Sequence, residues 1–176
     1  MKNFMPDCEL FVDTGSTSAS AFFVRDIYPY VRSWSCPSRM KKKRESYIHF
    51  MGDIFSSILE EMRPRRVWLE EPEFWSGSAK SQIAIARDNL FDLQACCITY
   101  ADRCAVARIP FRLVKARKWK GTLSKDATIA RVKRIDKSAD YANEHIWDAV
   151  AFGMSKNKDV WNLRIPRYKG VGDADL

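Results

Sequence analysis

Short apolar segments rich in β-branched and aromatic residues alternate along this chain with longer segments whose apolar residues recur every three or four positions. The short segments predict five β-strands: 8–13, 21–24, 27–34, 67–71 and 109–114. The longer segments predict four helices: 47–62, 79–97, 123–135 and 139–154. This order indicates an α/β fold, in which about five strands form a mixed central sheet with helices on both faces.

The size and charge of the chain limit its organisation and its partners. A length of 176 residues gives room for one domain with a full core. Lys and Arg number 30 against 22 Asp and Glu, and the net charge of +8 indicates a polyanionic partner. Nucleic acid is the partner that we expect, although an anionic membrane surface also satisfies the charge. The hydrophobic fraction of 46% excludes a disordered or collagen-like chain.

Targeting signals and cysteine usage indicate a cytoplasmic protein. No segment approaches the run of about 20 apolar residues that spans a bilayer, and the first residues lack the apolar stretch of a signal peptide. The five cysteines form no CxxC pair, and only two histidines accompany them. We therefore expect neither a disulfide framework nor a structural zinc site. We expect the thiols to be reduced and to pack in the core. We also expect no membrane partner and no small-molecule cofactor.

Three acids are predicted to lie on rigid apolar elements, where an unpaired carboxylate is costly. Asp13 ends the first strand, and Glu70 lies at the end of the strand VWLE. Asp148 lies in the helix HIWDAVAFG, one turn after His145. Each acid alone is explained equally well as a turn cap, a surface acid or an ordinary helix acid. Together they would repel strongly unless Mg²⁺ or Mn²⁺, the hard ions that carboxylate oxygens prefer, neutralised them.

A nucleic-acid substrate and a carboxylate site with two divalent ions indicate phosphodiester hydrolysis. In such sites one ion activates the attacking water and the other stabilises the leaving oxygen.

Four segments in order carry a resemblance to a known family: FVDTGSTSASAFFV; VWLEEPEFW with the following GSAKSQIAIARDNLFDLQ; KARKWKGTLSKDATIARVKRI; and NEHIWDAVAFG. Together they cover most of residues 7–154, and in their order and spacing the chain resembles the RuvC-type Holliday-junction resolvases of the RNase H-like superfamily, particularly their phage-encoded versions. The resemblance implies a nuclease domain over 1–155, a basic C-terminal extension over 156–176, and a location in the cytoplasm of a bacterium or a phage-infected host.

The resemblance also implies a crossover junction endodeoxyribonuclease. Asp13, Glu70 and Asp148 would ligate two Mg²⁺ or Mn²⁺ ions in each active site. His145 stands where the family commonly has an acid and where some members have histidine. It would ligate a metal, or orient or protonate a reacting group, unless it is simply a helix-surface histidine. Glu71 faces the other side of the strand from Glu70 and stays open as an alternative to it.

A homodimer is implied as well, with each subunit nicking one of two opposed strands of a four-way DNA junction. The helix over 78–97 is a candidate dimer element. The expected phosphate contacts come from basic residues near the third motif: Lys115, Arg117, Lys118, Lys120 and Lys125. Lys125 matches a functionally placed lysine of the family, and Lys80 and Arg87 are further candidates.

Two aromatic residues follow Glu70 in a loop where the family uses an aromatic side chain. Phe74 and Trp75 would stack on unpaired bases at the crossover, or else cover the core or the dimer interface. Trp119 is interpreted as a packing residue.

Three other functions stay open at this point. An RNase H-like nuclease would share the fold and prefer flaps, replication forks or RNA–DNA hybrids. A non-catalytic junction-binding protein would have no need of the three acids. DTGST also resembles the phosphate-binding hairpin of actin-like and sugar-kinase ATPases, but those proteins need a second glycine-rich loop, and this chain has only 7 glycines.

Overall fold

The computed structural model describes residues 8–15, 18–25, 28–40, 43–73, 89–135, 140–141 and 144–156. Its strands are β1 Glu9–Asp13, β2 Ser18–Arg25, β3 Tyr28–Ser35, β4 Arg66–Glu71 and β5 Phe111–Lys115. Its helices are α1 Arg44–Met62, α3 Asn89–Val106, α4 Ala116–Trp119, α5 Lys125–Ile135 and α6 Glu144–Lys156. The helix predicted over 79–97 is described from Asn89 onward, and most of the predicted extension over 156–176 lies outside the described residues.

The strands form one mixed sheet in the order β3-β2-β1-β4-β5. β1, β2 and β3 pair antiparallel, whereas β1 pairs in parallel with β4 and β4 in parallel with β5. Parallel neighbours need long crossover connections, and α1 and α3 supply them. The predicted mixed sheet of about five strands is therefore confirmed. Since β1, β4 and β5 run the same way, their C-terminal ends meet at one edge of the sheet.

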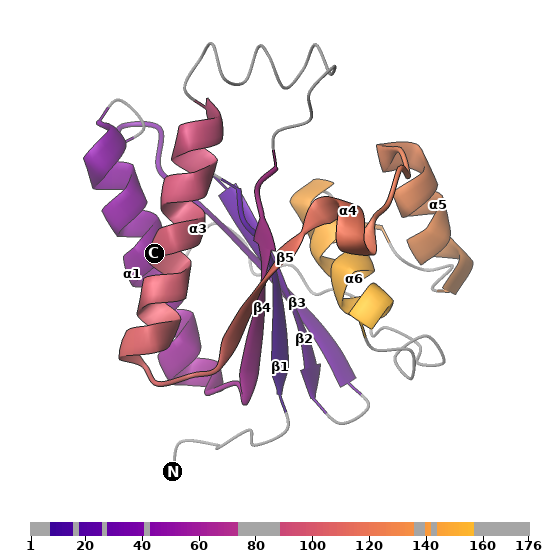
Figure 1. Cartoon of the computed structure of the whole chain (residues 1–176), viewed down its shortest axis with the longest axis horizontal. Helices are drawn as coiled ribbons and strands as arrows, with labels where there is room; N and C mark the ends of the chain where they lie inside the picture. Colours follow the sequence, from indigo (N-terminus) through magenta and orange to yellow (C-terminus); the bar gives the residue numbers. More distant parts are fainter. Residues whose placement is uncertain are drawn as a thin grey trace.

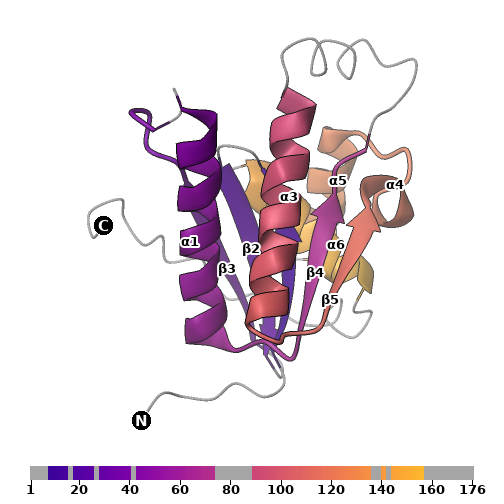
Figure 2. The ribbon, with the colours of Figure 1, turned by 60° about the vertical axis from the view of Figure 1, so that its left-hand side comes forward.

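Helices cover both faces of this sheet: α1 and α3 lie on one face, and α4, α5 and α6 lie on the other (Figure 1 and Figure 2). The side chains of β1 serve both layers in alternation. Leu10 and Val12 are fully buried in the core beneath α1 and α3, and Phe11 is fully buried in the core beneath α6. A strand covered on both sides is apolar throughout, which explains the continuous apolar run in the sequence.

α1 and α3 pack closely against each other on their face of the sheet. Met51, Phe55 and Ile58 recur at helical spacing on the buried side of α1. Gly52 lies at the contact with α3, because a Cβ atom added there would come within 2.7 Å of Thr99 Cγ2. The absence of a side chain at position 52 therefore sets how closely the two helices approach.

The cysteines belong to this packing. All five are buried, as the sequence predicted for thiols that pack in the core. Burial raises the pKa of the Cys96, Cys97 and Cys104 thiols to about 12, so these groups stay protonated at physiological pH.

Two helix boundaries and one missed helix need correction. The helix predicted over 79–97 continues to Val106, because Tyr100 and Cys104 carry its buried side beyond Cys97. The helix predicted over 139–154 begins at Glu144. Tyr141 lies outside it, because its ring packs 4.8 Å from that of Trp147 and its carbonyl accepts a hydrogen bond of 3.0 Å from Trp147 Nε1. The short helix α4 was not predicted, since four residues are too few to show a period. Within the described ranges, no helix combines the length and the apolar character that a membrane span requires.

Candidate active site

Asp13 is the last residue of β1 and is 9% exposed. The alternation along the strand puts it on the same side as Phe11, whose ring packs edge-on against Phe152 of α6. A carboxylate held there needs a partner, and Asp13 Oδ2 lies 2.6 Å from His145 Nδ1. The end of β1 and the first turns of α6 are joined by this contact.

Glu70 lies beside Asp13 because β1 and β4 are parallel and pair Val12 with Leu69. The Thr14 hydroxyl donates a hydrogen bond of 2.7 Å to the Glu70 carbonyl oxygen and ties the two strand ends together. The Glu70 carboxylate accepts a hydrogen bond of 3.1 Å at Oε2 from the indole N–H of Trp119. Glu70 is thus fixed both through its backbone and through its side chain.

The side chain of Glu71 points to the opposite face of the sheet from that of Glu70. Burial is the main cause of the raised pKa of the Cys97 thiol on α3, and the charge of Glu71 is the next. The Glu71 carboxylate therefore belongs to the α3 side of the sheet, while Glu70 belongs to the α6 side. The alternation of the strand separates the two acids, as the sequence required, and the structure brings Glu70 toward Asp13 and Asp148.

Asp148 lies one turn beyond His145 on α6 and holds two ammonium groups. Lys120 Nζ is 3.0 Å from Asp148 Oδ1, and Lys125 Nζ is 2.5 Å from Oδ2. The Asp148 side chain is 15% exposed, and those of the two lysines are 21% and 32% exposed. Ion pairs that are partly shielded from solvent are screened less by salt than exposed ones, so these two contacts tie both lysines to the acid cluster.

The three carboxylates act on one another electrostatically. The pKa of Glu70 is raised well above its ordinary value, first by burial and then by the charges of Asp13 and Asp148. Lys120 and the hydrogen bond from Trp119 work in the opposite direction and lower it. Repulsion of this kind favours any cation that enters the cluster, because the cation relieves it.

The donor chemistry of this cluster fits Mg²⁺ or Mn²⁺, which prefer carboxylate oxygens. In the described part of the chain, the side chains do not bring three or more His, Cys, Asp or Glu residues close enough together to hold a metal ion. The ammonium groups of Lys120 and Lys125 contact both oxygens of Asp148. Metal binding at this acid would therefore replace ammonium contacts.

The structure divides the predicted DNA contacts into groups. Lys120 and Lys125 belong to the acid cluster. Arg117 pairs with Glu73 at 3.1 Å, Lys118 is exposed, and Lys115 is half-buried at the end of β5. The remaining candidates lie outside the described residues: Phe74, Trp75, Lys80 and Arg87.

Two contributors to the site were not predicted as such. Trp119 is a packing residue, as expected, since it is 9% exposed and its ring lies 5.4 Å from that of Phe152. It is also the hydrogen-bond donor to Glu70. Thr14 was not predicted to contribute to the site. Both contacts join residues about 50 positions apart, so no local sequence pattern predicts them. The only sequence signal is that Thr14 and Trp119 each lie in or beside a motif.

In a comparison with solved structures, the fold of this chain is similar to that of the RuvC-type resolvases. Thermus thermophilus RuvC in complex with a Holliday junction substrate gives a TM-score of 0.65 at 14% identity, over 85% of this chain and 91% of its own. A further structure of Thermus thermophilus RuvC gives 0.59 at 13% identity, over 84% and 92%. The yeast mitochondrial Holliday junction resolvase Ydc2 gives 0.56 at 16% identity, over 91% and 81%.

The predicted fold is therefore confirmed, and at these identities the likeness concerns the fold alone. No protein-family model and no curated protein matches the chain. The phage origin expected from the sequence finds no support in these structures.

Proposed function

We propose that this chain is a metal-dependent endonuclease that resolves four-way DNA junctions by paired symmetric nicks. The observation that carries the proposal is that Asp13, Glu70 and Asp148 lie near enough to one another for the charges of Asp13 and Asp148 to raise the pKa of Glu70. The fold, shared with a RuvC solved on a Holliday junction substrate, supports DNA as the polyanion that a net charge of +8 indicates.

The roles proposed for the side chains follow from their contacts. Asp13, Glu70 and Asp148 would hold the metal ions, two in each active site, and His145 would ligate with them or orient Asp13. Bound Mg²⁺ or Mn²⁺ supplies Lewis-acid activation of water and of the leaving oxygen. Lys120 and Lys125 keep positive charge beside Asp148, where it attracts the phosphate backbone of the substrate.

Further contacts to DNA are proposed for Lys115, Arg117 and Lys118, with base stacking by Phe74 or Trp75. Replacing the exposed Lys118 by Ala is expected to weaken binding to all sequences about equally and to reduce the salt slope by about 1. An unchanged salt slope removes Lys118 from the interface.

We place the nuclease domain at 1–155 and the protein in the cytoplasm.

A homodimer would give the two-fold junction two active sites. On the outer side of α3, Phe91 and Ile98 are seven positions apart and are 51% and 67% exposed, whereas Tyr100 on the inner side is fully buried. Large exposed apolar side chains on one helix face support an interface there. Ile98→Glu is expected to give monomers in analytical ultracentrifugation and to abolish paired nicking. Dimers that persist in this variant exclude the α3 face.

The deciding experiment compares substrates of one sequence: a mobile four-way junction, a flap, a replication fork, an RNA–DNA hybrid and a linear duplex, each with Mg²⁺ or Mn²⁺. We expect the junction to be cut fastest, by paired nicks that a ligase can seal. Faster cleavage of the flap, fork or hybrid supports the alternative RNase H-like nuclease instead.

Site variants test the same proposal at the level of residues. Asp13→Asn and Glu70→Gln are expected to abolish cleavage and to leave junction binding intact. Glu71→Gln is the matched control, since it makes the same chemical change one residue away on the other face of the sheet. Cleavage by Asp13→Asn at the wild-type rate, or an equal loss in the control, refutes the site assignment.

A further inference from the structure

A groove of about 680 Å³ opens at the end of the sheet opposite to the acid cluster, between the C-terminal ends of α1 and α3. β4 and β5 begin at this end (Figure 2). Arg66, the first residue of β4, is four residues from Glu70, a distance of about 13 Å along the strand. The groove is therefore separate from the proposed active site.

The groove combines an apolar floor with a basic rim. Leu59, Val106 and Ile109 are among the apolar lining residues, and Val106 is 72% exposed. Four of the twelve lining residues are arginines: Arg63, Arg65, Arg103 and Arg108. Glu60 is the one acid among them. Exposed apolar surface surrounded by charge is typical of a site that binds another molecule.

Two of these arginines occupy backbone positions that favour glycine. Arg63 and Arg108 have φ values of 43° and 55°, in the left-handed region. Both end helices: Arg63 N–H donates to the Leu59 carbonyl at 2.9 Å, and Arg108 N–H donates to the Ala105 carbonyl at 3.0 Å. Glycine is the usual residue at such helix ends, because a side chain there costs stability. Strained positions of this kind gather at functional sites.

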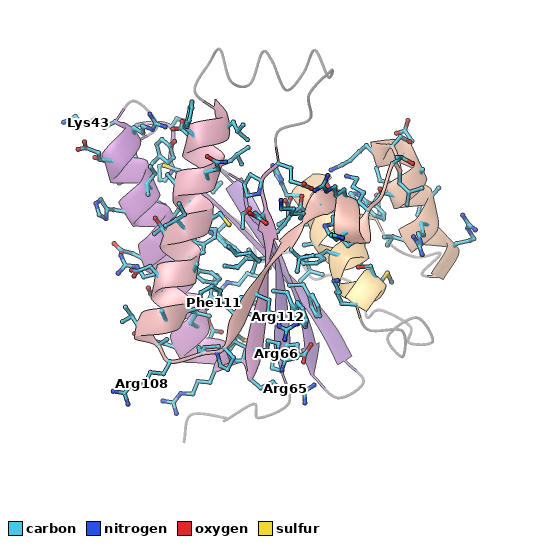
Figure 3. The ribbon with its side chains drawn as sticks, in the orientation of Figure 1. Lys43, Arg65, Arg66, Arg108, Phe111 and Arg112 are labelled. Carbon is cyan, nitrogen blue, oxygen red and sulfur yellow. The ribbon has the colours of Figure 1, made fainter. Side chains whose placement is uncertain are left out.

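The rim arginines differ in their partners. Arg65 is held by Glu9 at 3.0 Å, and Arg103 is held by Asp53 at 3.1 Å. Neither Arg63 nor Arg108 pairs with a carboxylate within the ranges that the structure describes. Figure 3 shows Arg65 and Arg108 at this end of the molecule, directed away from the ribbon. Among the described residues, the guanidinium groups of Arg63 and Arg108 are therefore available to a ligand.

We propose that this groove binds a short acidic segment of another protein, with apolar side chains on the floor and carboxylates paired by Arg63 and Arg108. A guanidinium group matches a carboxylate through two parallel hydrogen bonds. A DNA backbone would satisfy the arginines but would leave the apolar floor uncovered, and an aliphatic ligand would leave the arginines unpaired. An acidic segment with apolar anchors satisfies both.

The test begins with random 12-residue peptides displayed on phage and selected on the full-length protein. We expect selection of peptides that combine Asp or Glu with Leu, Ile or Phe. The selected peptides, labelled with fluorescein, are then titrated against wild type and the variant Arg63→Gly/Arg108→Gly. We expect a loss of affinity of at least about tenfold in the variant. Arg112→Ala, which removes an exposed arginine outside the groove, is the matched control and should change affinity less than about twofold.

The glycine variant also separates binding from folding. Since both positions favour glycine, its melting temperature should equal or exceed that of wild type, and junction cleavage should not change. A lower melting temperature means that the arginines serve stability and overturns the proposal.

Four further results overturn it. Selection without acidic peptides excludes the proposed ligand, and equal peptide affinity in the variant excludes the groove. A matching loss of affinity for a 20-base-pair duplex makes this a DNA surface. A change of mass in ultracentrifugation makes it an interface between copies of the chain.

Discussion

The hydrogen bond from Trp119 to Glu70 allows one contact in the site to be removed with little other change. Trp119→Phe keeps an aromatic ring in the contact with Phe152 and deletes the indole N–H that donates to Glu70 Oε2 at 3.1 Å. The fold should survive, because the ring stays within a buried apolar cluster. What changes is the balance between the ionised and the protonated forms of the Glu70 carboxyl.

The size and sign of the effect follow from the contacts of Glu70. A hydrogen bond to a charged group contributes about 1.5–3 kcal/mol. The Trp119 hydrogen bond lowers a pKa that burial, Asp13 and Asp148 have raised, so its loss raises that pKa further. Metals bind the ionised carboxyl. Below the raised pKa we therefore expect the Mg²⁺ concentration for half-maximal binding to increase by about tenfold or more, and the defect should shrink as pH rises through that pKa.

The assay measures Mg²⁺-induced stabilisation by thermal melting, and the Mg²⁺ dependence of junction cleavage, across a range of pH. Trp34→Phe is the matched control, because it also deletes a buried indole donor, to the Tyr100 hydroxyl at 3.3 Å, on the other side of the sheet. The control should lose stability without a change in Mg²⁺ dependence. If Trp119→Phe binds Mg²⁺ as wild type does at every pH, Trp119 is only a packing residue.

Three further predictions concern the metal-free protein. The raised pKa of Glu70 means that its stabilising contribution is complete below the unfolded pKa and is lost as pH rises through the folded pKa. Glu70→Gln should therefore melt at a higher temperature than wild type in EDTA at pH 8 and show no gain at pH 4; a lower melting temperature at pH 8 contradicts the reasoning. Gly52→Ala should lose about 1–3 kcal/mol in urea unfolding, because its Cβ meets Thr99 at 2.7 Å, a cost that exceeds the helix preference of Ala; unchanged unfolding shows that α3 yields. Cys97 and Cys104, with pKa values of about 12, should resist iodoacetamide at pH 8 until urea is added, as mass spectrometry can follow; rapid labelling of the folded protein rules out their burial.

The fold was predictable because burial leaves a pattern of apolar residues in the sequence, either a continuous run or a helical period. β1 is apolar on both faces and α1 repeats its apolar residues at helical spacing, so both elements were found within a few residues. α4 and the start of α6 were missed, because neither is set by a period. A tertiary contact decides the second, where Tyr141 packs on Trp147 instead of entering the helix.

The acids of the site were predictable for a different reason, namely that a carboxylate at the end of an apolar strand is costly without a partner. The sequence leaves open which face of the sheet each carboxylate points to. Alternation requires Glu70 and Glu71 to face opposite sides, but which side holds α6 depends on how the helices cross over the sheet. The indole of Trp119 was out of reach as well, since 49 residues separate it from Glu70.

The charges of the cluster bear on why the acids stay together before any metal binds. Two ammonium groups, from Lys120 and Lys125, stand against three carboxylates, and both of them hold Asp148. Burial, and after it the charges of Asp13 and Asp148, raises the pKa of Glu70 well above its ordinary value. A closed network of ion pairs would leave no acid in this state. In this cluster the Glu70 carboxyl instead takes up either a proton or an added cation. This property suits a site in which a metal ion replaces a proton.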